Sequence, residues 1–384
     1  MVRYGRRGTR TKGWGRRGFA VAGCLAAIAC LLMAAALSCS RGEEACFRGG
    51  RTHTARAYGP KIAGELLWKK QLNGWIVSTP VVAEGRVYVG DTGLKSVYAL
   101  SAADGKELWR YETEGPIVSS PLVVSGLVLI GSQDHAFYAL GARDGTLKWR
   151  FETGQTINSS AVTDGRLVYF GSWDAKLYAL KVKDGTKVWE FATGGMITSS
   201  PALYRGKLYF GSWDGNVYCV DAFNGKKLWS FKGPEQPAKV GSSPAVEAGR
   251  VYVGDTAGYL YCLDAEAGNE IWKYKTNFWV DSSPALAGDR VVVGSADRLL
   301  YCFDKAKGTL LWTFEGQGPI ISSPFIYNDV VYVGGEAGRL AGVSLADGKK
   351  VWEFFTPAPI KSSPVAVDGR LYVCSYDSYV YAFK

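Results

Sequence analysis

The sequence predicts an all-β fold: an eight-bladed β-propeller of four-stranded antiparallel blades, with the ring closed by the N-terminal strand. Eight tryptophans recur at steps of 40 to 43 residues, each within a similar local sequence. A period of about 40 residues indicates one structural unit copied many times, whose copies must pack on one another to bury their apolar faces. The repeated tryptophans are Trp68, Trp109, Trp149, Trp189, Trp229, Trp272, Trp312 and Trp352.

One copy, residues 195–231, shows the unit well. Short segments of alternating apolar and polar residues are separated by turns, and the last turn contains Asn224-Gly225, a strong hairpin signal. The expected strands are residues 196–203, 207–211, 216–220 and 226–231. Four antiparallel strands in about 40 residues are what a propeller blade requires, with the first strand nearest the axis and the tryptophan on the outermost strand.

The two ends of the chain are expected to share one blade. The segments that end at Trp109 through Trp352 make seven complete blades, and residues 356–384 supply only three further strands. The segment 64–69, which contains Trp68, supplies the missing fourth strand. This pairing closes the ring and leaves no open sheet edge between the first and last blades.

Side chains that recur once per copy are expected to serve the fold. We expect each repeated tryptophan to be a packing residue, because an indole buries roughly 150–250 Å². Serine pairs followed by proline suit the crowded axis, and they occur at 119–121, 199–201, 242–244, 282–284, 322–324 and 362–364. Acids recur in the turn after the second strand, at Asp134, Asp174, Asp214, Asp297 and Asp377. Asx-type turn hydrogen bonds explain these acids more simply than a metal site does, because one acid occurs per blade.

Some positions depart from the repeat. Cys219, Cys262 and Cys302 share one position, and Cys374 replaces a glycine. Equivalent positions of neighbouring blades lie too far apart for a disulfide, so we expect free buried thiols. Ala341 replaces a tyrosine that the other seven copies carry. The missing ring leaves two alternatives, a shallow pocket or a cavity filled by a neighbouring side chain.

The net charge of +10 comes from the N-terminal residues. Residues 1–61 hold twelve of the 45 basic and two of the 35 acidic residues, so residues 62–384 contain 33 of each sign. No basic stripe or base-stacking pattern remains in the repeats, and we expect no nucleic-acid partner.

The N-terminus has the parts of an export signal. Seven basic residues precede an uncharged apolar run over 19–37, which is followed by Ser38 and Cys39. The run is also long enough to span a bilayer as an uncleaved anchor. Residues 36–39 resemble a bacterial lipoprotein cleavage site, so Cys39 is the candidate for lipidation. We therefore expect a signal peptide or membrane anchor over 1–38, a flexible tail over 39–61 and the propeller over 62–384, exported to the periplasm or attached to the outer membrane.

The copies resemble the pyrroloquinoline-quinone (PQQ)-type propeller repeat. The resemblance covers about 62–384 and rests on phrases such as Asp-Gly-Lys-Glu-Leu-Trp at 104–109, Ser-Ser-Pro and Gly-Ser-Trp-Asp-Gly. Within this group an exported eight-bladed ring with a possible lipid anchor is similar to the BamB family, lipoproteins of the outer-membrane β-barrel assembly machinery. The resemblance implies a protein-binding scaffold that contacts that machinery. The quinoprotein dehydrogenases of the same group add long loops, often a disulfide of adjacent cysteines, and a calcium site.

Three functions are considered for a propeller with this repeat. We expect a non-catalytic scaffold without a cofactor or metal, because no two cysteines are adjacent, the chain has two histidines, and the only sizeable insertion is three residues near 234–241. The alternatives are a glycan or small-ligand sensor and, less favoured, a PQQ-dependent dehydrogenase. Aromatic residues that the repeat does not require fall in connections that open onto one face, and aromatics are enriched at binding hot spots. The candidate partner-binding residues are Trp75, Trp173, Trp213, Trp279, Phe278 and Tyr376.

Overall fold

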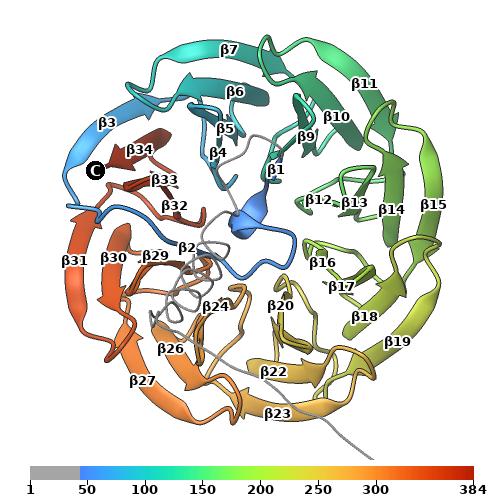
Figure 1. The fold of residues 1–384 in the computed structure, drawn as a ribbon, viewed down its shortest axis with the longest axis vertical. Coiled ribbons are helices and arrows are strands. Elements are labelled where there is room, and N and C mark those ends of the chain that lie inside the picture. Colours follow the sequence, from blue (N-terminus) through green and yellow to red (C-terminus); the bar gives the residue numbers. More distant parts are fainter. Residues whose placement is uncertain (1–43) are drawn as a thin grey trace, which may run out of the picture. The chain divides into compact units, whose positions relative to one another are not determined.

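The computed structural model describes residues 44–384, and the expected signal segment and Cys39 lie outside this part of the chain. Eight antiparallel sheets stand around a central axis as the blades of a propeller (Figure 1). Within each blade the first strand lies nearest the axis and the tryptophan-bearing strand forms the outer rim, which confirms the predicted fold class.

Blades 1 to 4 follow one another along the chain. Blade 1 consists of β4 (Val81–Ala83), β5 (Arg86–Gly90), β6 (Ser96–Ser101) and β7 (Glu107–Glu112), and blade 2 of β8 (Leu122–Val124), β9 (Leu127–Gly131), β10 (Ala136–Gly141) and β11 (Leu147–Glu152). Blade 3 consists of β12 (Val162–Thr163), β13 (Leu167–Gly171), β14 (Lys176–Lys181) and β15 (Lys187–Ala192), and blade 4 of β16 (Ala202–Tyr204), β17 (Lys207–Gly211), β18 (Asn216–Asp221) and β19 (Lys227–Lys232).

Blades 5 to 8 complete the circle. Blade 5 consists of β20 (Ala245–Glu247), β21 (Arg250–Gly254), β22 (Tyr259–Asp264) and β23 (Glu270–Lys275), and blade 6 of β24 (Ala285–Ala287), β25 (Arg290–Gly294), β26 (Leu299–Asp304) and β27 (Leu310–Glu315). Blade 7 consists of β28 (Phe325–Tyr327), β29 (Val330–Gly334), β30 (Arg339–Ser344) and β31 (Lys350–Phe355), and blade 8 of β32 (Val365–Val367), β33 (Arg370–Cys374), β34 (Tyr379–Phe383) and β3 (Leu66–Gln71).

Blade 8 closes the ring as the sequence predicts. The N-terminal strand β3 pairs antiparallel with the C-terminal strand β34, and Trp68 lies opposite Ala382 in the register. In Figure 1 these two strands, from opposite ends of the colour bar, lie side by side. The sheet edge that a chain of seven blades and three strands would expose is therefore paired.

Each repeated tryptophan joins its own blade to the next one. The indole Nε1 of Trp68, in blade 8, donates a hydrogen bond of 3.2 Å to the carbonyl of Ala102 in blade 1. The ring covers Gly105 of the same turn so closely that a Cβ there would lie 2.6 Å from it. Six further tryptophans, from Trp109 to Trp312, make the same two contacts with the following blade. At the last boundary Trp352 packs on Gly64, just before β3.

A second closed ring of contacts lies near the axis. In each blade the backbone N–H of the second residue of the serine pair donates to the side-chain oxygen of its counterpart in the next blade, at 2.9–3.2 Å. The order is Thr79, Ser120, Ser160, Ser200, Ser243, Ser283, Ser323, Ser363 and back to Thr79. The serine pairs therefore serve the inter-blade hydrogen bonding, and we call this set the serine belt.

The recurring turn acids have two roles within their blades. Asp214 shows both: one carboxylate oxygen accepts from the backbone N–H of Asn216 at 2.9 Å, as expected of an Asx turn, and the other accepts from the hydroxyl of Tyr218 at 2.7 Å. The tyrosine bond also occurs at Asp134, Asp174, Asp297 and Asp377. Burial, followed by the Asp214 hydrogen bond, raises the pKa of Tyr218, so the phenol stays protonated and donates.

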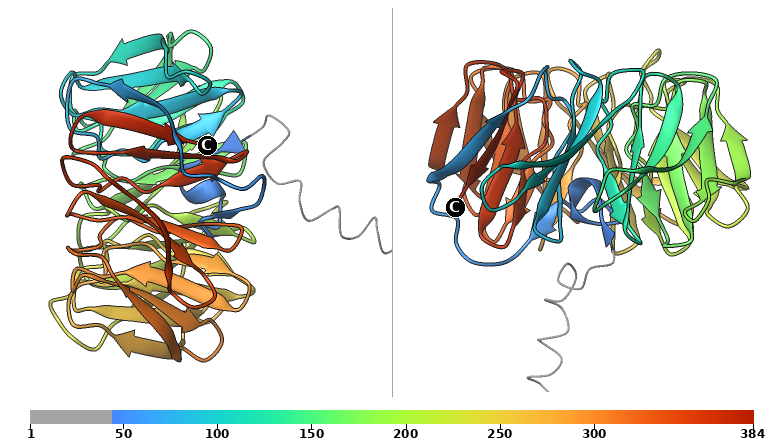
Figure 2. Two further views of the ribbon diagram at one scale, coloured as in Figure 1. Left: turned by 90° about the vertical axis from the view of Figure 1, so that its left-hand side faces the viewer. Right: turned by 90° about the horizontal axis from the view of Figure 1, so that it is seen from above.

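Residues 44–61 form a plug in the central channel. The plug contains β1 (Glu44–Ala45), which pairs with β8, the 3-10 turn η1 (Phe47–Gly49), and β2 (Arg56–Ala57), which pairs with β28. Its backbone carbonyls accept hydrogen bonds of 2.7–2.9 Å from the inner strands of blades 4 to 7, in the pairs Arg51–Leu203, Thr52–Val246, Thr54–Leu286 and Ala55–Ile326. The expectation of a flexible tail is wrong for these residues, which Figures 1 and 2 show inside the ring.

The plug carries buried polar side chains. Arg48 and His53 are almost fully buried, and Arg48 donates to the backbone carbonyls of Pro284 and His53. Burial lowers the pKa of the His53 imidazole to about 3, with a further contribution from the Arg48 charge. Neither ring nitrogen of His53 has a hydrogen-bond partner among residues 44–384. The imidazole is therefore neutral in the folded protein.

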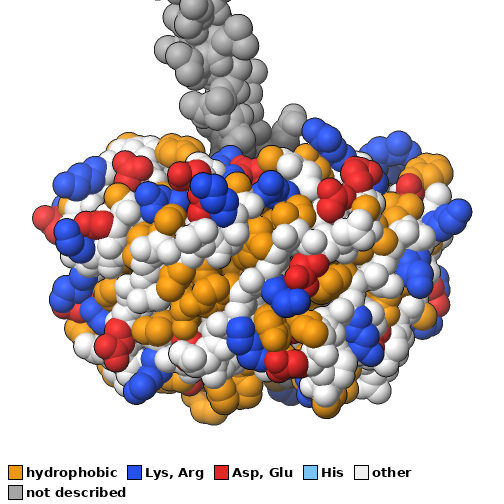
Figure 3. Space-filling view, turned by 90° about the horizontal axis from the view of Figure 1, so that it is seen from below, with side chains coloured by type: hydrophobic (Ala, Val, Ile, Leu, Met, Phe, Trp, Pro, Cys, Tyr) orange, Lys and Arg blue, Asp and Glu red, His pale blue; other side chains and the backbone are white. Residues whose placement is uncertain are grey.

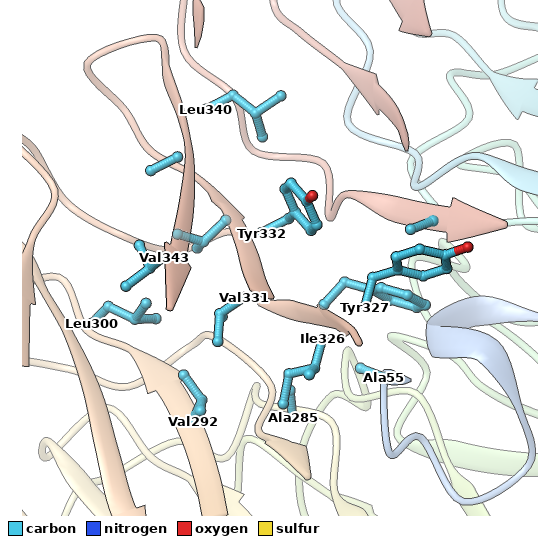
Figure 4. Close-up of a cluster of buried hydrophobic side chains, with 14 of the residues drawn as sticks. Ala55, Ala285, Val292, Leu300, Ile326, Tyr327, Val331, Tyr332, Leu340 and Val343 are labelled. Carbon is cyan, nitrogen blue, oxygen red and sulfur yellow. The ribbon is translucent and has the colours of Figure 1, made fainter. Parts of the chain in front are cut away.

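The apolar core is distributed between neighbouring blades. The largest cluster spans blades 6, 7 and 8 and includes Ala55 of the plug, which lies beside Ile326 and Ala285 (Figure 4). On the outer wall, apolar side chains are exposed between charged ones (Figure 3). They include the residue just before the tryptophan in six blades, which is 42–55% exposed: Leu108, Val188, Leu228, Ile271, Leu311 and Val351. Strand alternation turns this residue outward when the tryptophan turns inward.

Removing one oxygen from the serine belt should destabilise the ring. Ser243→Ala leaves the buried N–H of Ser200 without its acceptor, so we expect the free energy of unfolding to fall by about 1–3 kcal/mol. Ser243→Thr is the matched control, because Thr79 fills the equivalent position of blade 1 and accepts in the same way. Denaturant unfolding measures both variants, and an equal loss in the two would contradict the role of the oxygen.

The buried imidazole should make stability depend on pH below neutrality. The pKa of His53 is lower in the folded protein than its unfolded value of about 6.5, so the unfolded chain binds the proton first as pH falls. The free energy of unfolding should then decrease from about pH 6.5 toward pH 3, by about 1.4 kcal/mol per pH unit well below 6.5.

Chemical denaturation at pH 7, 6 and 5 tests this expectation. His53→Asn should flatten the dependence, and asparagine suits the positive φ of this position. His135→Asn, at an exposed histidine that also has positive φ, should leave the slope as in the wild type. An unchanged slope in His53→Asn would rule out the buried imidazole as its source.

Candidate binding face

The connections between strands divide the ring into two faces. Strands alternate in direction within a blade, so the connections from strand four to strand one and from strand two to strand three open on one face, which we call the aromatic face. The remaining connections open on the opposite face, which we call the plug face. The N-terminal plug contacts the ends of the inner strands there, and Ala57 accepts a hydrogen bond from Asn328 in the first turn of blade 7.

Trp75 and Tyr376 form a stacked aromatic pair. Trp75 lies between β3 and β4 and is 62% exposed, and Tyr376 lies between β33 and β34. Their rings stack at a centroid distance of 5.4 Å and an interplanar angle of 4°. The Nζ of Lys361 lies 5.2 Å from the Tyr376 centroid and 3.1 Å from a carboxylate oxygen of Glu336. The sequence-predicted residues of blade 8 and of the connection to blade 1 are thus brought together.

Phe278 and Trp279 form a second pair in the connection between β23 and β24. Their rings lie 4.7 Å apart, and the two side chains are 52% and 42% exposed. The backbone is fixed beneath them, because the carbonyl of Phe278 accepts from the Thr276 hydroxyl and that of Trp279 from the N–H of Ala296. The rings are therefore presented to solvent on a well-supported turn.

Trp173 and Trp213 form a third, half-buried pair. Their rings lie 6.0 Å apart, in the turns between strands two and three of blades 3 and 4. Trp213 Nε1 donates to the Thr198 hydroxyl at 3.0 Å, and the Nζ of Lys239 lies 4.0 Å from the Trp213 centroid. Trp173 Nε1 is buried and has no hydrogen-bond partner within residues 44–384. This pair contributes to packing as well as to the surface.

The six predicted residues therefore form three pairs around one face. Within residues 44–384 no ring contact joins one pair to another. Lys239, which lies against the Trp213 ring, was not among the predicted residues. The only sequence signal for it was its place in the three-residue insertion between blades 4 and 5.

The structure of blade 7 shows what occupies the space of the tyrosine that Ala341 replaces. Alanine also stands at 337, where blade 6 carries Asp297, so blade 7 lacks both partners of the tyrosine–aspartate bond. Arg339 fills the space: it is 7% exposed, its guanidinium lies 4.9 Å from the Phe314 ring, and it donates to the Glu315 carbonyl at 3.0 Å. A void of only about 10 Å³ remains beside Ala341. The missing ring is replaced by a neighbour, and no ligand pocket results.

Comparison with known proteins gives the family. A sequence family described as "Beta-alanine-activating enzyme, beta-propeller" matches residues 124–329, more than half of the chain. The chain belongs to this β-propeller family. A search of curated proteins finds no significant match.

Three solved structures share the fold of this chain. BamB from Moraxella catarrhalis is 18% identical, with a TM-score of 0.71 over 84% of this chain and 100% of that one. Quinohemoprotein alcohol dehydrogenase from Comamonas testosteroni is 15% identical, with a TM-score of 0.76 over 92% of this chain and 82% of that one. A computationally designed protein, Ika8, is 15% identical, with a TM-score of 0.75 over 83% of this chain and 99% of that one. At these identities the likeness shows the shared fold.

The PQQ-type repeat raises the question of whether the channel mouth fits PQQ, which carries three carboxylates. The residues just before the serine pairs lie in the connections on the aromatic face, next to the serine belt: Val77, Val118, Asn158, Thr198, Gly241, Asp281, Ile321 and Lys361. Burial raises the pKa of Asp281, and the nearby Lys239 partly offsets this effect. Lys361 is the one cation among these eight residues and already pairs with Glu336, so they do not supply the positive charge that a tricarboxylate needs.

The predicted cysteines differ in whether the structure describes them. Cys219, Cys262, Cys302 and Cys374 are buried free thiols, and burial raises the pKa of Cys262 to about 11. Cys39, the lipidation candidate, falls outside the described residues. Over 44–384, no helix has the length and apolar character needed to cross a bilayer. The same residues contain no group of three or more His, Cys, Asp or Glu side chains placed to hold a metal ion.

The two classes of tryptophan should differ sharply in their effect on stability. Trp109→Ala removes a 9% exposed indole that joins two blades, and we expect a loss of about 3–5 kcal/mol. Trp75→Ala removes an exposed ring and one stacking contact, and we expect a loss below about 1.5 kcal/mol. Thermal and denaturant unfolding of both variants test the distinction. A loss at Trp75 as large as that at Trp109 would mean that Trp75 holds the fold.

Proposed function

We propose that this chain is a non-catalytic exported scaffold whose aromatic face binds a protein partner of the outer-membrane β-barrel assembly machinery. The observation that carries the proposal is the exposure of three aromatic rings where the repeat requires none: Trp75, which stacks on Tyr376, and the paired Phe278 and Trp279. Other copies place Pro116, Thr156 or Met196 at the position of Trp75 and Trp279.

The arrangement suits protein recognition. Tryptophan and tyrosine dominate binding hot spots, and rings already held against each other lose little conformational entropy on binding. Lys361 and Lys239 lie beside two of the pairs and supply cations next to apolar surface. A partner segment with apolar side chains and acidic or carbonyl groups would complement such a face.

Two observations support a periplasmic location. The N-terminal sequence has the parts of an export signal, and Cys39 is the proposed site of a lipid anchor. The solved BamB structure spans the same fold over its whole length. We therefore place the ring in the periplasm, attached to the outer membrane, without a cofactor or metal and without a nucleic-acid partner.

A glycan or small-ligand sensor is the second candidate. The exposed Trp75 ring, held flat against Tyr376, is an aromatic platform on which a sugar ring could pack as well as a protein side chain. Saccharide binding that quenches tryptophan fluorescence, and is lost in Trp75→Ala, would favour this function over the scaffold.

Loss of the two exposed indoles should weaken partner binding. Trp75→Ala combined with Trp279→Ala should reduce the affinity of the full chain for the purified barrel-forming component by at least tenfold, because hot-spot truncations each cost about 2 kcal/mol or more. The control is Phe223→Ala, an exposed aromatic on the opposite face. Co-purification and surface-immobilised binding measure the effect.

Two results would contradict the proposal. Full retention of binding in the double variant would exclude the aromatic face as the site. A thermal midpoint raised by PQQ with calcium would contradict the non-catalytic assignment, because a bound ligand stabilises the folded state.

A further inference from the structure

The plug face contains a large basic groove. It has a volume of about 1330 Å³ and crosses blades 2, 3 and 4. Six basic and two acidic side chains line it: Lys148, Arg166, Lys181, Lys183, Arg205 and Lys207, with Asp164 and Asp221. The groove lies on the face opposite the aromatic pairs, so the proposed scaffold function does not use it.

Both acids of the groove accept hydrogen bonds from backbone N–H groups. Asp164 accepts from the N–H groups of Arg166 and Leu167 and from the Tyr169 hydroxyl. Asp221 accepts from the N–H groups of Phe223 and Asn224. Among the basic residues, Lys207 pairs with Glu266, and the other five form no ion pair within residues 44–384. The groove lining thus carries a net positive charge, with six cations against two carboxylates.

An exposed aromatic stands at the edge of this groove. Phe223 is 81% exposed, and the Asp221 carboxylate holds its turn through two backbone hydrogen bonds of 2.9 and 3.0 Å. The fold does not require an aromatic here, because the other copies carry small or charged residues. They are Ala103, Arg143, Lys183, Glu266, Ala306 and Ala346.

The N-terminal segment joins the ring at the plug face. Glu44 pairs with Val124, the last residue of β8, which ends at the plug face. Cys39 is five residues earlier, so a lipid on Cys39 would lie within about 18 Å of this face even if the intervening chain were fully extended. An uncleaved anchor over 19–37 would impose a similar limit, of about 25 Å.

We propose that the plug face docks onto a membrane surface rich in anionic phospholipid, with the groove cations on the phosphates and Phe223 in the headgroup region. Basic clusters with an apolar side chain are the features that bind such surfaces. Each lysine or arginine near an anionic surface contributes about fivefold in affinity. The ring would then lie with its aromatic face toward the periplasmic partner, away from the lipid.

Vesicle binding tests this orientation. Residues 42–384 form a compact unit that contains every strand of the ring, so a chain starting at Gly42 removes binding by the anchor itself. We expect it to co-sediment with vesicles of phosphatidylglycerol and phosphatidylcholine, and to bind pure phosphatidylcholine at least tenfold more weakly. Lys183→Ala with Arg205→Ala should weaken binding about 25-fold, and Phe223→Ala about tenfold.

Matched variants on the aromatic face are the controls. Lys232→Ala and Phe278→Ala remove an exposed cation and an exposed aromatic there, and should leave vesicle binding unchanged. Equal binding to both vesicle types, or wild-type binding by the groove variants, would overturn the proposal. Binding of a poly-glutamate peptide that the groove variants lose, without vesicle binding, would overturn it in favour of an acidic protein segment. None of these outcomes depends on the aromatic-face partner.

Discussion

The contact between a tryptophan of one blade and a glycine turn of the next is the interaction on which the ring depends. A blade is a small twisted sheet that cannot bury both of its faces alone, so its stability comes from its neighbours. The indole supplies apolar area and a hydrogen bond at the outer rim, and the turn glycine allows the ring to lie against the backbone. The packing of tryptophan on glycine recurs at all eight boundaries, and the hydrogen bond accompanies it at the seven boundaries from Trp68 to Trp312.

The serine belt complements this contact near the axis. The tryptophans fix the rim, where blades are wide apart, and the hydroxyls fix the narrow centre, where only small side chains fit. The two sets of contacts hold each blade at two radii and so limit both its tilt and its separation from its neighbour. Connections on the two faces are consequently free to vary. Those of blades 8 and 1, 3 and 4, and 5 and 6 carry aromatic pairs on one face, and those of blades 2 to 4 form a charged groove on the other.

Much of this architecture could be predicted from the sequence because it is periodic. Counting tryptophans located the incomplete blade and its missing strand at Trp68, and the spacing of the turn acids indicated Asx turns. The tyrosine partner of those acids, four residues later in the chain, was visible as a repeated residue but was not connected with them. Arg339 could not be foreseen in the place of the missing ring, since its fit depends on the shape of the space beside Phe314.

The plug could not be predicted, for a physical reason. Its hydrogen bonds to blades 4 to 7 run through backbone carbonyls, which leave no side-chain pattern in residues 51–55. The candidate binding face could be predicted in part. All six aromatic residues could be named from the sequence because the repeat does not require them, but only the structure shows that they form three pairs, of which one is half-buried.

The pairing of β3 with β34 also constrains the order in which the molecule can assemble. Leu66 meets Phe383, so the two strands of the closing blade are separated by nearly the whole chain. Contacts between such distant segments form late, because the loop between them must first be ordered. During synthesis the first strand of the ring to emerge would have an unpaired edge until the last residues arrive. A ring of this design therefore has its most vulnerable interval before its synthesis is complete, when a holding chaperone would matter most.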